Sequence, residues 1–210
     1  MRIVAENLGK KFARDWIFRG FSFAFEPGRR YAITGNNGSG KTTLLKSLTG
    51  MQPTSEGQVT YEKGPKTIPI EDVFKHFTFT TPSLELIEEF TLAEQVEFYA
   101  KFRELTLAPS ALLERMQLTP HRHKPIRFFS SGMKQKTKLG LALFTDATAI
   151  FLDEPTTNLD RENIAWYLET IHSPRPDTTL IISSNQPYEY DFCEEILVMD
   201  TYKPAKRRSV

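Results

Sequence analysis

The sequence predicts an α/β fold with an inserted helical lobe, on three observations. A glycine-rich loop, Gly35–Thr43, stands between an apolar strand-like run and a helix-prone run. A second apolar run, Ala149–Leu152, ends in Asp153 and Glu154, as expected for a strand buried on both faces of a parallel sheet. Between these two runs, the stretch from Thr91 to Leu143 has mainly helical patterns, which indicates a lobe inserted into the α/β core.

Composition narrows the class of protein. The 210 residues are 40% hydrophobic and 25% charged, as in ordinary globular domains. The formal net charge of +1 provides no field that attracts nucleic acid, so no nucleic-acid partner is expected. A single cysteine, Cys193, excludes an internal disulfide and a cysteine-rich metal site. No signal sequence or bilayer-spanning run is evident, so we expect a cytoplasmic protein whose membrane part, if any, belongs to a separate chain.

The N-terminal quarter predicts strands. Three apolar or alternating runs are typical of strands: Ile3–Ala5, Phe21–Phe25 and Gln58–Tyr61. Between the first two we expect a polar loop over Lys10–Trp16. Its aromatic side chains, at 12 and 16, either stack on a flat ring of a ligand or close the edge of a small sheet.

The loop that follows the strand-like run Tyr31–Ile33 has the pattern of a phosphate-binding P-loop. Its glycines let the backbone turn sharply and bring N–H groups close to a ligand. With the N-terminus of the next helix, these groups suit a polyphosphate, while Lys41 would reach the β- and γ-phosphates and Thr42 would bind Mg²⁺. The alternative is a glycine-rich turn that merely precedes a helix. The predicted ligand-binding residues are Gly35, Asn36, Asn37, Gly38, Ser39, Gly40, Lys41, Thr42 and Thr43.

The middle of the chain turns from ambiguous to helical. The stretch Phe74–Phe79 is compatible with a strand. Thr91 and Glu94 form a capping box, which predicts the start of a helix. An apolar and aromatic stripe on that helix, extending to Phe102, favours core packing over a ligand site. Another short helix is expected from Pro109.

Two further stretches have weaker signals. His121 and His123 precede a proline in a polar loop, and they are expected to be solvated because no other metal-ligating cluster is close in sequence. The basic tail, residues 203–208, is expected to be a frayed terminus.

Two polar segments at predicted element ends have the chemistry of phosphate sites. In Phe129–Gln135, consecutive serines before a glycine would cap a helix and present N–H groups to an anion, although this pattern alone is typical of any capped helix. Asp153 and Glu154, at the tip of a buried strand, are costly unless they face a cation or a reacting group. Asp153 would hold Mg²⁺ through its water shell, and Glu154 would polarise an attacking water.

The order of these motifs, followed by Thr156–Asp160, resembles the nucleotide-binding subunit of ATP-binding-cassette (ABC) transporters over nearly the whole chain. The resemblance implies a P-loop NTPase core with a mixed sheet, flanking helices and an N-terminal antiparallel β subdomain. It also implies a single ABC ATPase domain, 1–210, in which 1–82 and 146–210 form the nucleotide-binding core and 83–145 a helical subdomain.

The resemblance also implies roles for individual residues. Gly35–Thr43 matches the Walker A loop, Ile150–Asp153 the Walker B strand, and Glu154 the catalytic glutamate. Phe12 falls near the aromatic that stacks on adenine. The variant signature motif contributes Ser130, Ser131 and Gly132, and the D-loop contributes Asp160.

Several partners follow from the resemblance. Two cassettes, as a homodimer or with a paralogous subunit, sandwich two ATP molecules with Mg²⁺, and Ser130 and Gly132 act on the ATP of the other copy. A separate transmembrane permease would place the chain on the cytoplasmic face of the membrane.

Two departures bear on hydrolysis. Asn185 stands where the family usually has a histidine that contacts the γ-phosphate. The family also has a glutamine in the stretch that corresponds to Phe79–Ser83, and this segment contains no glutamine. Asn185 can donate a hydrogen bond but cannot carry a positive charge, so both departures affect the rate of hydrolysis and leave nucleotide binding intact. The candidate catalytic residues are Glu154, Lys41 and Asn185.

The leading functional prediction is an ATPase subunit that powers a membrane protein through ATP-driven dimerisation. One alternative is a slow or near-inactive ATP-dependent clamp. Another is a non-transport ABC ATPase acting on DNA or ribosomes, which the single cassette, the lack of long heptads and the low net charge disfavour. A small P-loop kinase or GTPase would leave the serine-glycine segment unexplained.

Overall fold

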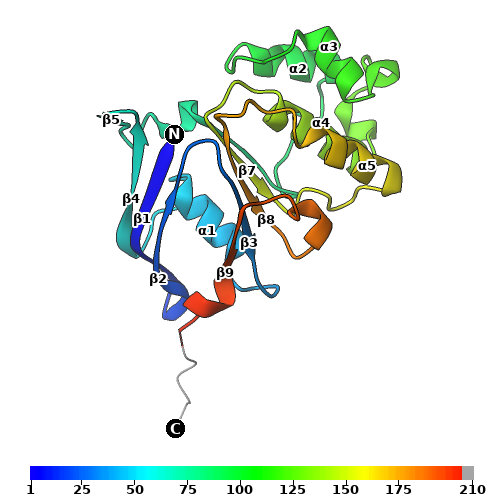
Figure 1. Cartoon of the computed structure of the whole chain (residues 1–210). Coiled ribbons are helices and arrows are strands. Elements are labelled where there is room, and N and C mark those ends of the chain that lie inside the picture. The colour runs from blue at the N-terminus through cyan, green and yellow to red at the C-terminus, as the bar shows by residue number, and fades with distance from the viewer. Residues whose placement is uncertain (205–210) are drawn as a thin grey trace.

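The computed structural model describes residues 1–204, and most of the basic tail lies outside them. Two sheets organise the chain, with helices packed between and beside them (Figure 1). Among the described residues, no helix combines the length and the apolar character that a membrane span requires.

The first sheet is antiparallel, in the order β2-β1-β4-β5. Its strands are β1 (Arg2–Phe12), β2 (Asp15–Phe25), β4 (Glu56–Lys63) and β5 (Lys66–Thr67). The expectation of a polar loop over Lys10–Trp16 is wrong, because Lys11 pairs with Trp16 across the hairpin and only two residues form the turn. The Lys11 ammonium lies 5.4 Å from the Trp16 ring and the Arg19 guanidinium lies 4.7 Å from it, so cation–π contacts extend the ladder.

The second sheet has the order β6-β7-β8-β3-β9, and every neighbouring pair in it is parallel. Its strands are β3 (Arg30–Thr34), β6 (Phe77–Thr80), β7 (Ala149–Asp153), β8 (Thr179–Ser183) and β9 (Glu195–Val198). All residues of β7 and β8 are buried, as their continuous apolar runs predict. The stretch Phe74–Phe79 is only partly a strand, because a 3₁₀ turn, η1 (Val73–Lys75), precedes β6.

The helices expected after the P-loop, after Thr91, from Pro109 and after Ser130 are present, and a further helix follows Asp160. They are α1 (Lys41–Leu48), α2 (Leu92–Ala100), α3 (Pro109–Arg115), α4 (Ser131–Leu143) and α5 (Arg161–Thr170), with further 3₁₀ turns η2 (Thr119–His121), η3 (Ile126–Phe128), η4 (Pro187–Glu189) and η5 (Met199–Tyr202). The capping box before α2 is present: the Thr91 hydroxyl accepts from the Glu94 N–H at 3.3 Å, and the Glu94 carboxylate accepts from the Thr91 N–H at 2.7 Å.

Two hydrophobic clusters hold these elements together. One contains side chains of both sheets and of α1, and the other joins α2, α3, α4 and α5 to β7 and β8. The expected stripe on α2 is buried at Leu92 and Val96, but Phe102 is 72% exposed. The helix ends at Ala100, so the helical spacing no longer brings residue 102 onto the buried face.

The two histidines of the loop before Pro125 have no metal-like surroundings. His121 packs edge-on against Phe129, and His123 is hydrogen-bonded by the Arg122 side chain at 2.9 Å. Within residues 1–204, no group of three or more His, Cys, Asp or Glu side chains is arranged to hold a metal ion.

Candidate active site

The candidate site lies at the carboxyl ends of β3, β7 and β8, which are adjacent in the parallel sheet. Ligands commonly bind at this edge of an open α/β sheet. The loop Gly35–Thr43 follows β3, Asp153 ends β7 with Glu154 directly after it, and Asn185 follows β8. The topology therefore brings together three of the segments that the sequence predicts to act on phosphate.

The glycines of the loop have conformational and steric reasons to be glycine. Gly35, Gly38 and Gly40 have φ angles of +141°, +74° and +99°, in the region that side chains disfavour. A Cβ on Gly40 would lie 2.6 Å from Cγ2 of Ile17, and a Cβ on Gly35 would lie 2.9 Å from a carboxylate oxygen of Asp200. The backbone can take this tight path only without side chains at 35 and 40.

The loop is arranged as an anion-binding cradle. The Lys41 ammonium is held above it by the carbonyl oxygen of Gly35, at 2.7 Å. No side chain caps α1 at Gly40, and the first turn of α1 has no acidic residue, so its N-terminal N–H groups are available to an anion. The hydroxyl of Ser39 is buried without a hydrogen-bond partner. A cavity of about 280 Å³ lies over this loop and is also lined by Ile17 and Glu154.

Asp200 is a residue of the site that sequence reasoning missed. Its carboxylate, in η5, accepts a 2.9 Å hydrogen bond from the backbone N–H of Asn36. That hydrogen bond holds the pKa of Asp200 below its usual value. The available signal is an acidic residue just after the strand β9, which lies next to β3 at the sheet edge.

The carboxylate of Asp153 fits a divalent cation. The Thr42 hydroxyl donates to Oδ2 of Asp153 at 2.7 Å, and the Thr81 hydroxyl donates to the same oxygen at 3.3 Å. Oδ1 of Asp153 is buried with no hydrogen-bond partner, a costly arrangement that a cation would relieve. Carboxylate and hydroxyl oxygens are ligands that Mg²⁺ prefers, with phosphates and water completing its shell. The residues present therefore fit Mg²⁺.

Glu154 lies at the junction of two cavities. It lines the cavity over the P-loop and a neighbouring one of about 320 Å³ that also contains Asn37 and Asn185. Its φ of +44° is unusual for a residue with a side chain, and its N–H donates to the Ser183 carbonyl oxygen at 2.8 Å. Such a conformation persists only where the surroundings fix it, which is common at functional sites.

Asn185 contacts the P-loop directly. Its side-chain amide donates a 3.0 Å hydrogen bond to the side-chain oxygen of Asn37. The side chain is exposed, so it is free to exchange this partner for a phosphate oxygen.

Glu189 is the second residue that sequence reasoning missed. It is only 1% exposed, and its Oε1 accepts hydrogen bonds from the N–H (2.9 Å) and the hydroxyl of Thr156. Its Oε2 is buried without a partner, and burial raises the pKa of this carboxyl. No local sequence pattern distinguishes this glutamate, because its partner lies 33 residues earlier in the loop after Glu154.

The residues predicted to form the signature motif and the D-loop make helix caps and a close packing contact in this chain. Ser130 caps α4 by accepting from the Met133 N–H at 3.2 Å, as its position predicts. Asp160 caps α5 by accepting from the Asn163 N–H at 2.9 Å. A Cβ on Gly132 would lie 3.0 Å from the carbonyl oxygen of Asn158, so the start of α4 packs closely against the loop before α5.

Several residues predicted to contact the ligand do not line the cavities at the P-loop. Of the described residues, those lining the two cavities around Glu154 do not include Ser130, Ser131, Gly132 or Asp160. Phe12 does not line them either. It is 50% exposed at the end of the β1–β2 hairpin, with the Lys10 ammonium 5.1 Å from its ring centre.

Known proteins are similar to this chain in sequence and in fold. The ABC transporter family model matches residues 18–157. The cytochrome c biogenesis ATP-binding export protein CcmA of Chelativorans sp. (strain BNC1) is 30% identical over 174 residues, which cover 82% of this chain and 85% of that protein. The linearmycin resistance ATP-binding protein LnrL of Bacillus subtilis (strain 168) is 28% identical over 206 residues, 93% of this chain and 65% of LnrL.

A solved structure supports the fold. The dimeric ATP-binding cassette MJ0796, in a post-hydrolysis state bound to ADP and Pi, has a TM-score of 0.79 and 18% identity, covering 99% of this chain and 100% of that one. The predicted α/β fold with an antiparallel β subdomain is confirmed. With more than half of its length matched by the family model, this chain belongs to the ABC transporter family as an ATP-binding cassette.

Proposed function

We propose that this cassette binds ATP with Mg²⁺ and hydrolyses it to power a separate membrane subunit. The position of Glu154 carries the proposal. This residue lines the cavity over the P-loop, and it directly follows Asp153, which is hydrogen-bonded by the Thr42 hydroxyl. A carboxylate at that place is suited to activate a water against the terminal phosphate.

Binding would use groups that the loop already presents. The N–H groups of the loop and of the first turn of α1, with the Lys41 ammonium, would neutralise the β- and γ-phosphates. Mg²⁺, held near Asp153 and Thr42, would supply further positive charge to the phosphates. Phe12 is proposed to stack on the adenine ring.

The chemical step requires one proton acceptor and one γ-phosphate contact. As the water oxygen attacks the γ-phosphorus, Glu154 accepts its proton, the bond from phosphorus to the β–γ bridging oxygen breaks, and ADP leaves with the electron pair. Asn185 would release Asn37 and donate its hydrogen bond to a γ-phosphate oxygen. A hydrogen bond that strengthens as charge develops lowers the barrier.

The complete site would need a second cassette. Four of the predicted ligand-binding residues do not line the P-loop cavities of their own chain: Ser130, Ser131, Gly132 and Asp160. We propose that they complete the site of a second copy or of a paralogue. In this arrangement residues 83–145 act as the helical subdomain of a single domain. A separate transmembrane subunit would hold the dimer at the cytoplasmic face of the membrane.

The test compares Glu154→Gln with wild type and with Glu97→Gln, an exposed glutamate on α2. We expect Glu154→Gln to lose hydrolysis by about 10²-fold or more, while it retains ATP binding and ATP-dependent dimerisation. Phosphate release, equilibrium nucleotide binding and size-exclusion chromatography measure the three properties. Wild-type turnover by Glu154→Gln removes that residue from the role of base, and failure of the wild type to bind ATP rejects the function.

A slow ATP-dependent clamp is the second candidate, and the uncharged Asn185 favours it. It predicts ATP-driven dimers with very little phosphate release from the wild type in the same assay. A membrane protein that co-purifies with the chain after gentle solubilisation would favour a transporter subunit over a non-transport ABC ATPase.

A further inference from the structure

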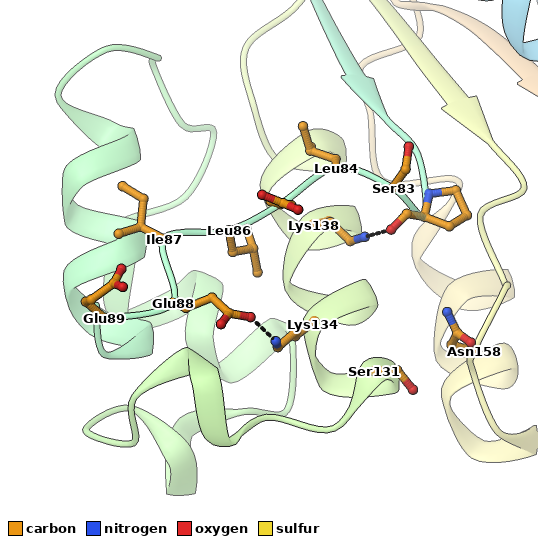
Figure 2. Close-up of a pocket in the computed structure, with 12 residues that line it drawn as sticks. Ser83, Leu84, Leu86, Ile87, Glu88, Glu89, Ser131, Lys134, Lys138 and Asn158 are labelled. Carbon is orange, nitrogen blue, oxygen red and sulfur yellow. Dashed lines mark hydrogen bonds and ion pairs between the residues drawn. The ribbon is translucent and has the colours of Figure 1, made fainter.

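A groove lies between helix α4 and the segment that connects β6 to α2. Figure 2 shows residues 83–89 of this segment passing beside α4, with Asn158 on the other side. The cavity here has a volume of about 710 Å³. Two lysines of α4, one helical turn apart, reach from the helix toward the connecting segment.

The two lysines are held differently. Lys134 forms an ion pair with Glu88, whose side chain is largely exposed. Lys138 is 6% exposed, and its ammonium donates to the carbonyl oxygens of Thr81 at 3.1 Å and Pro82 at 2.8 Å. A buried ammonium that binds only neutral carbonyl groups is unfavourable compared with a hydrocarbon side chain. Its presence therefore calls for a role besides filling the groove.

Thr81 connects this lysine to the candidate cation site. The carbonyl of Thr81 binds Lys138, and the hydroxyl of the same residue donates to Oδ2 of Asp153 at 3.3 Å. That oxygen also accepts from the Thr42 hydroxyl, while Oδ1 of Asp153 is buried without a partner. Hydrogen bonds thus connect Lys138 on α4 to the backbone of Thr81, and the side chain of Thr81 to the carboxylate that would hold Mg²⁺.

We propose that Lys138 is a positioning residue that fixes the Thr81 hydroxyl beside the divalent-cation site and so couples α4 to that site. Thr81 lies in the segment Phe79–Ser83, which contains no glutamine, and its hydroxyl is a side-chain oxygen of that segment that contacts Asp153. Because α4 begins at Ser131, directly after the cap Ser130, a contact there with a second cassette would be transmitted to Asp153. This inference rests on the proposed binding of Mg²⁺ and ATP.

The experiment separates nucleotide binding from cation binding. Binding of a fluorescent ATP analogue is measured in EDTA and across a Mg²⁺ titration for wild type, Lys138→Met, Thr81→Val and Lys134→Met. Methionine keeps the length and apolar stem of lysine, and Lys134→Met removes the other lysine contact with the same segment. Thermal unfolding verifies that each variant is folded.

We expect Lys138→Met and Thr81→Val to raise the Mg²⁺ concentration at half-saturation about tenfold, the usual size of an effect from groups that orient metal ligands. Binding in EDTA should stay unchanged, and Lys134→Met should match wild type. An unchanged Mg²⁺ requirement in Lys138→Met or in Thr81→Val overturns the inference, as does an equal shift in Lys134→Met.

The result remains decisive in two special cases. If Lys138→Met does not fold, Thr81→Val decides, because it leaves the lysine and the backbone carbonyl in place, and an unshifted Mg²⁺ requirement then refutes the inference. If the wild type binds no nucleotide in EDTA or in Mg²⁺, the proposed function itself fails, which is a different outcome.

Discussion

The side-chain amide of Asn185 lies 3.0 Å from the side-chain oxygen of Asn37 and donates a hydrogen bond to it. The contact joins the end of β8 to the P-loop across the cavity that Glu154 also lines. Both partners are exposed, so the bond is easily exchanged for one to a ligand. Asn185 thus links the carboxyl end of β8 directly to the P-loop.

Replacing Asn185 tests this placement. Because a hydrogen bond to a charged group contributes roughly 1.5–3 kcal/mol, Asn185→Ala should slow phosphate release by about tenfold or more while nucleotide affinity changes little. Asn185→His should hydrolyse faster than wild type, since an imidazole can carry positive charge. A brisk wild-type rate that Asn185→Ala leaves unchanged would exclude both a catalytic role for Asn185 and the clamp.

Two glycines of the P-loop offer a matched pair for testing its steric limits. Gly38 and Gly40 both have positive φ angles, so alanine at either position costs about 1–2 kcal/mol of backbone strain. A Cβ on Gly38 meets nothing within 4 Å, whereas one on Gly40 lies 2.6 Å from Ile17. Gly40→Ala should therefore lose more stability and more ATP affinity than Gly38→Ala, by urea unfolding and nucleotide titration. Equal losses would mean that strain alone explains the requirement for glycine.

Local patterns predicted the parts of the site whose chemistry is contained in a few consecutive residues. The glycines, Lys41 and Thr42 of the P-loop are of this kind, and so is the cap at Ser130, because loop conformation and helix initiation depend on neighbouring residues. The buried strand before Asp153 follows from its unbroken apolar run.

The remaining parts depend on contacts between distant residues. Asp200 reaches Asn36 across 164 positions, and Lys138 reaches Thr81 across 57, so no local pattern pairs either residue with its partner. The Lys10–Trp16 segment looks polar, yet Lys11 and Trp16 pair across a hairpin. This pairing stabilises strand structure instead of a loop. Only the tertiary fold decides such cases.

The capping box before α2 gives a stability prediction. Thr91→Ala removes the hydroxyl that accepts from the Glu94 N–H, and such a loss costs about 1 kcal/mol of unfolding free energy. Urea unfolding should show this loss, while Glu97→Gln on the exposed side of the same helix should match wild type. A Thr91→Ala variant as stable as wild type would show that tertiary packing alone fixes the start of α2.

Glu189 gives a pH prediction whose sign follows from its burial. Its carboxyl accepts two hydrogen bonds from Thr156, but burial raises its pKa above the ordinary value of 4.5. The folded protein therefore retains a proton at pH values where the unfolded chain has released it. The stabilisation linked to this proton is complete below about pH 4.5 and is lost as the pH rises through the higher pKa of the folded state.

Glu189→Gln should remove this part of the pH dependence, because the amide keeps an oxygen to accept from Thr156 and never ionises. Urea unfolding of both proteins from pH 4.5 to neutrality, at constant ionic strength, should show wild type losing stability relative to the variant as the pH rises. Parallel profiles would mean that Glu189 is ionised to the same extent in both states. ATP binding by Glu189→Gln at neutral pH serves as the control, since a folded P-loop does not need the charge of Glu189 and affinity should be retained.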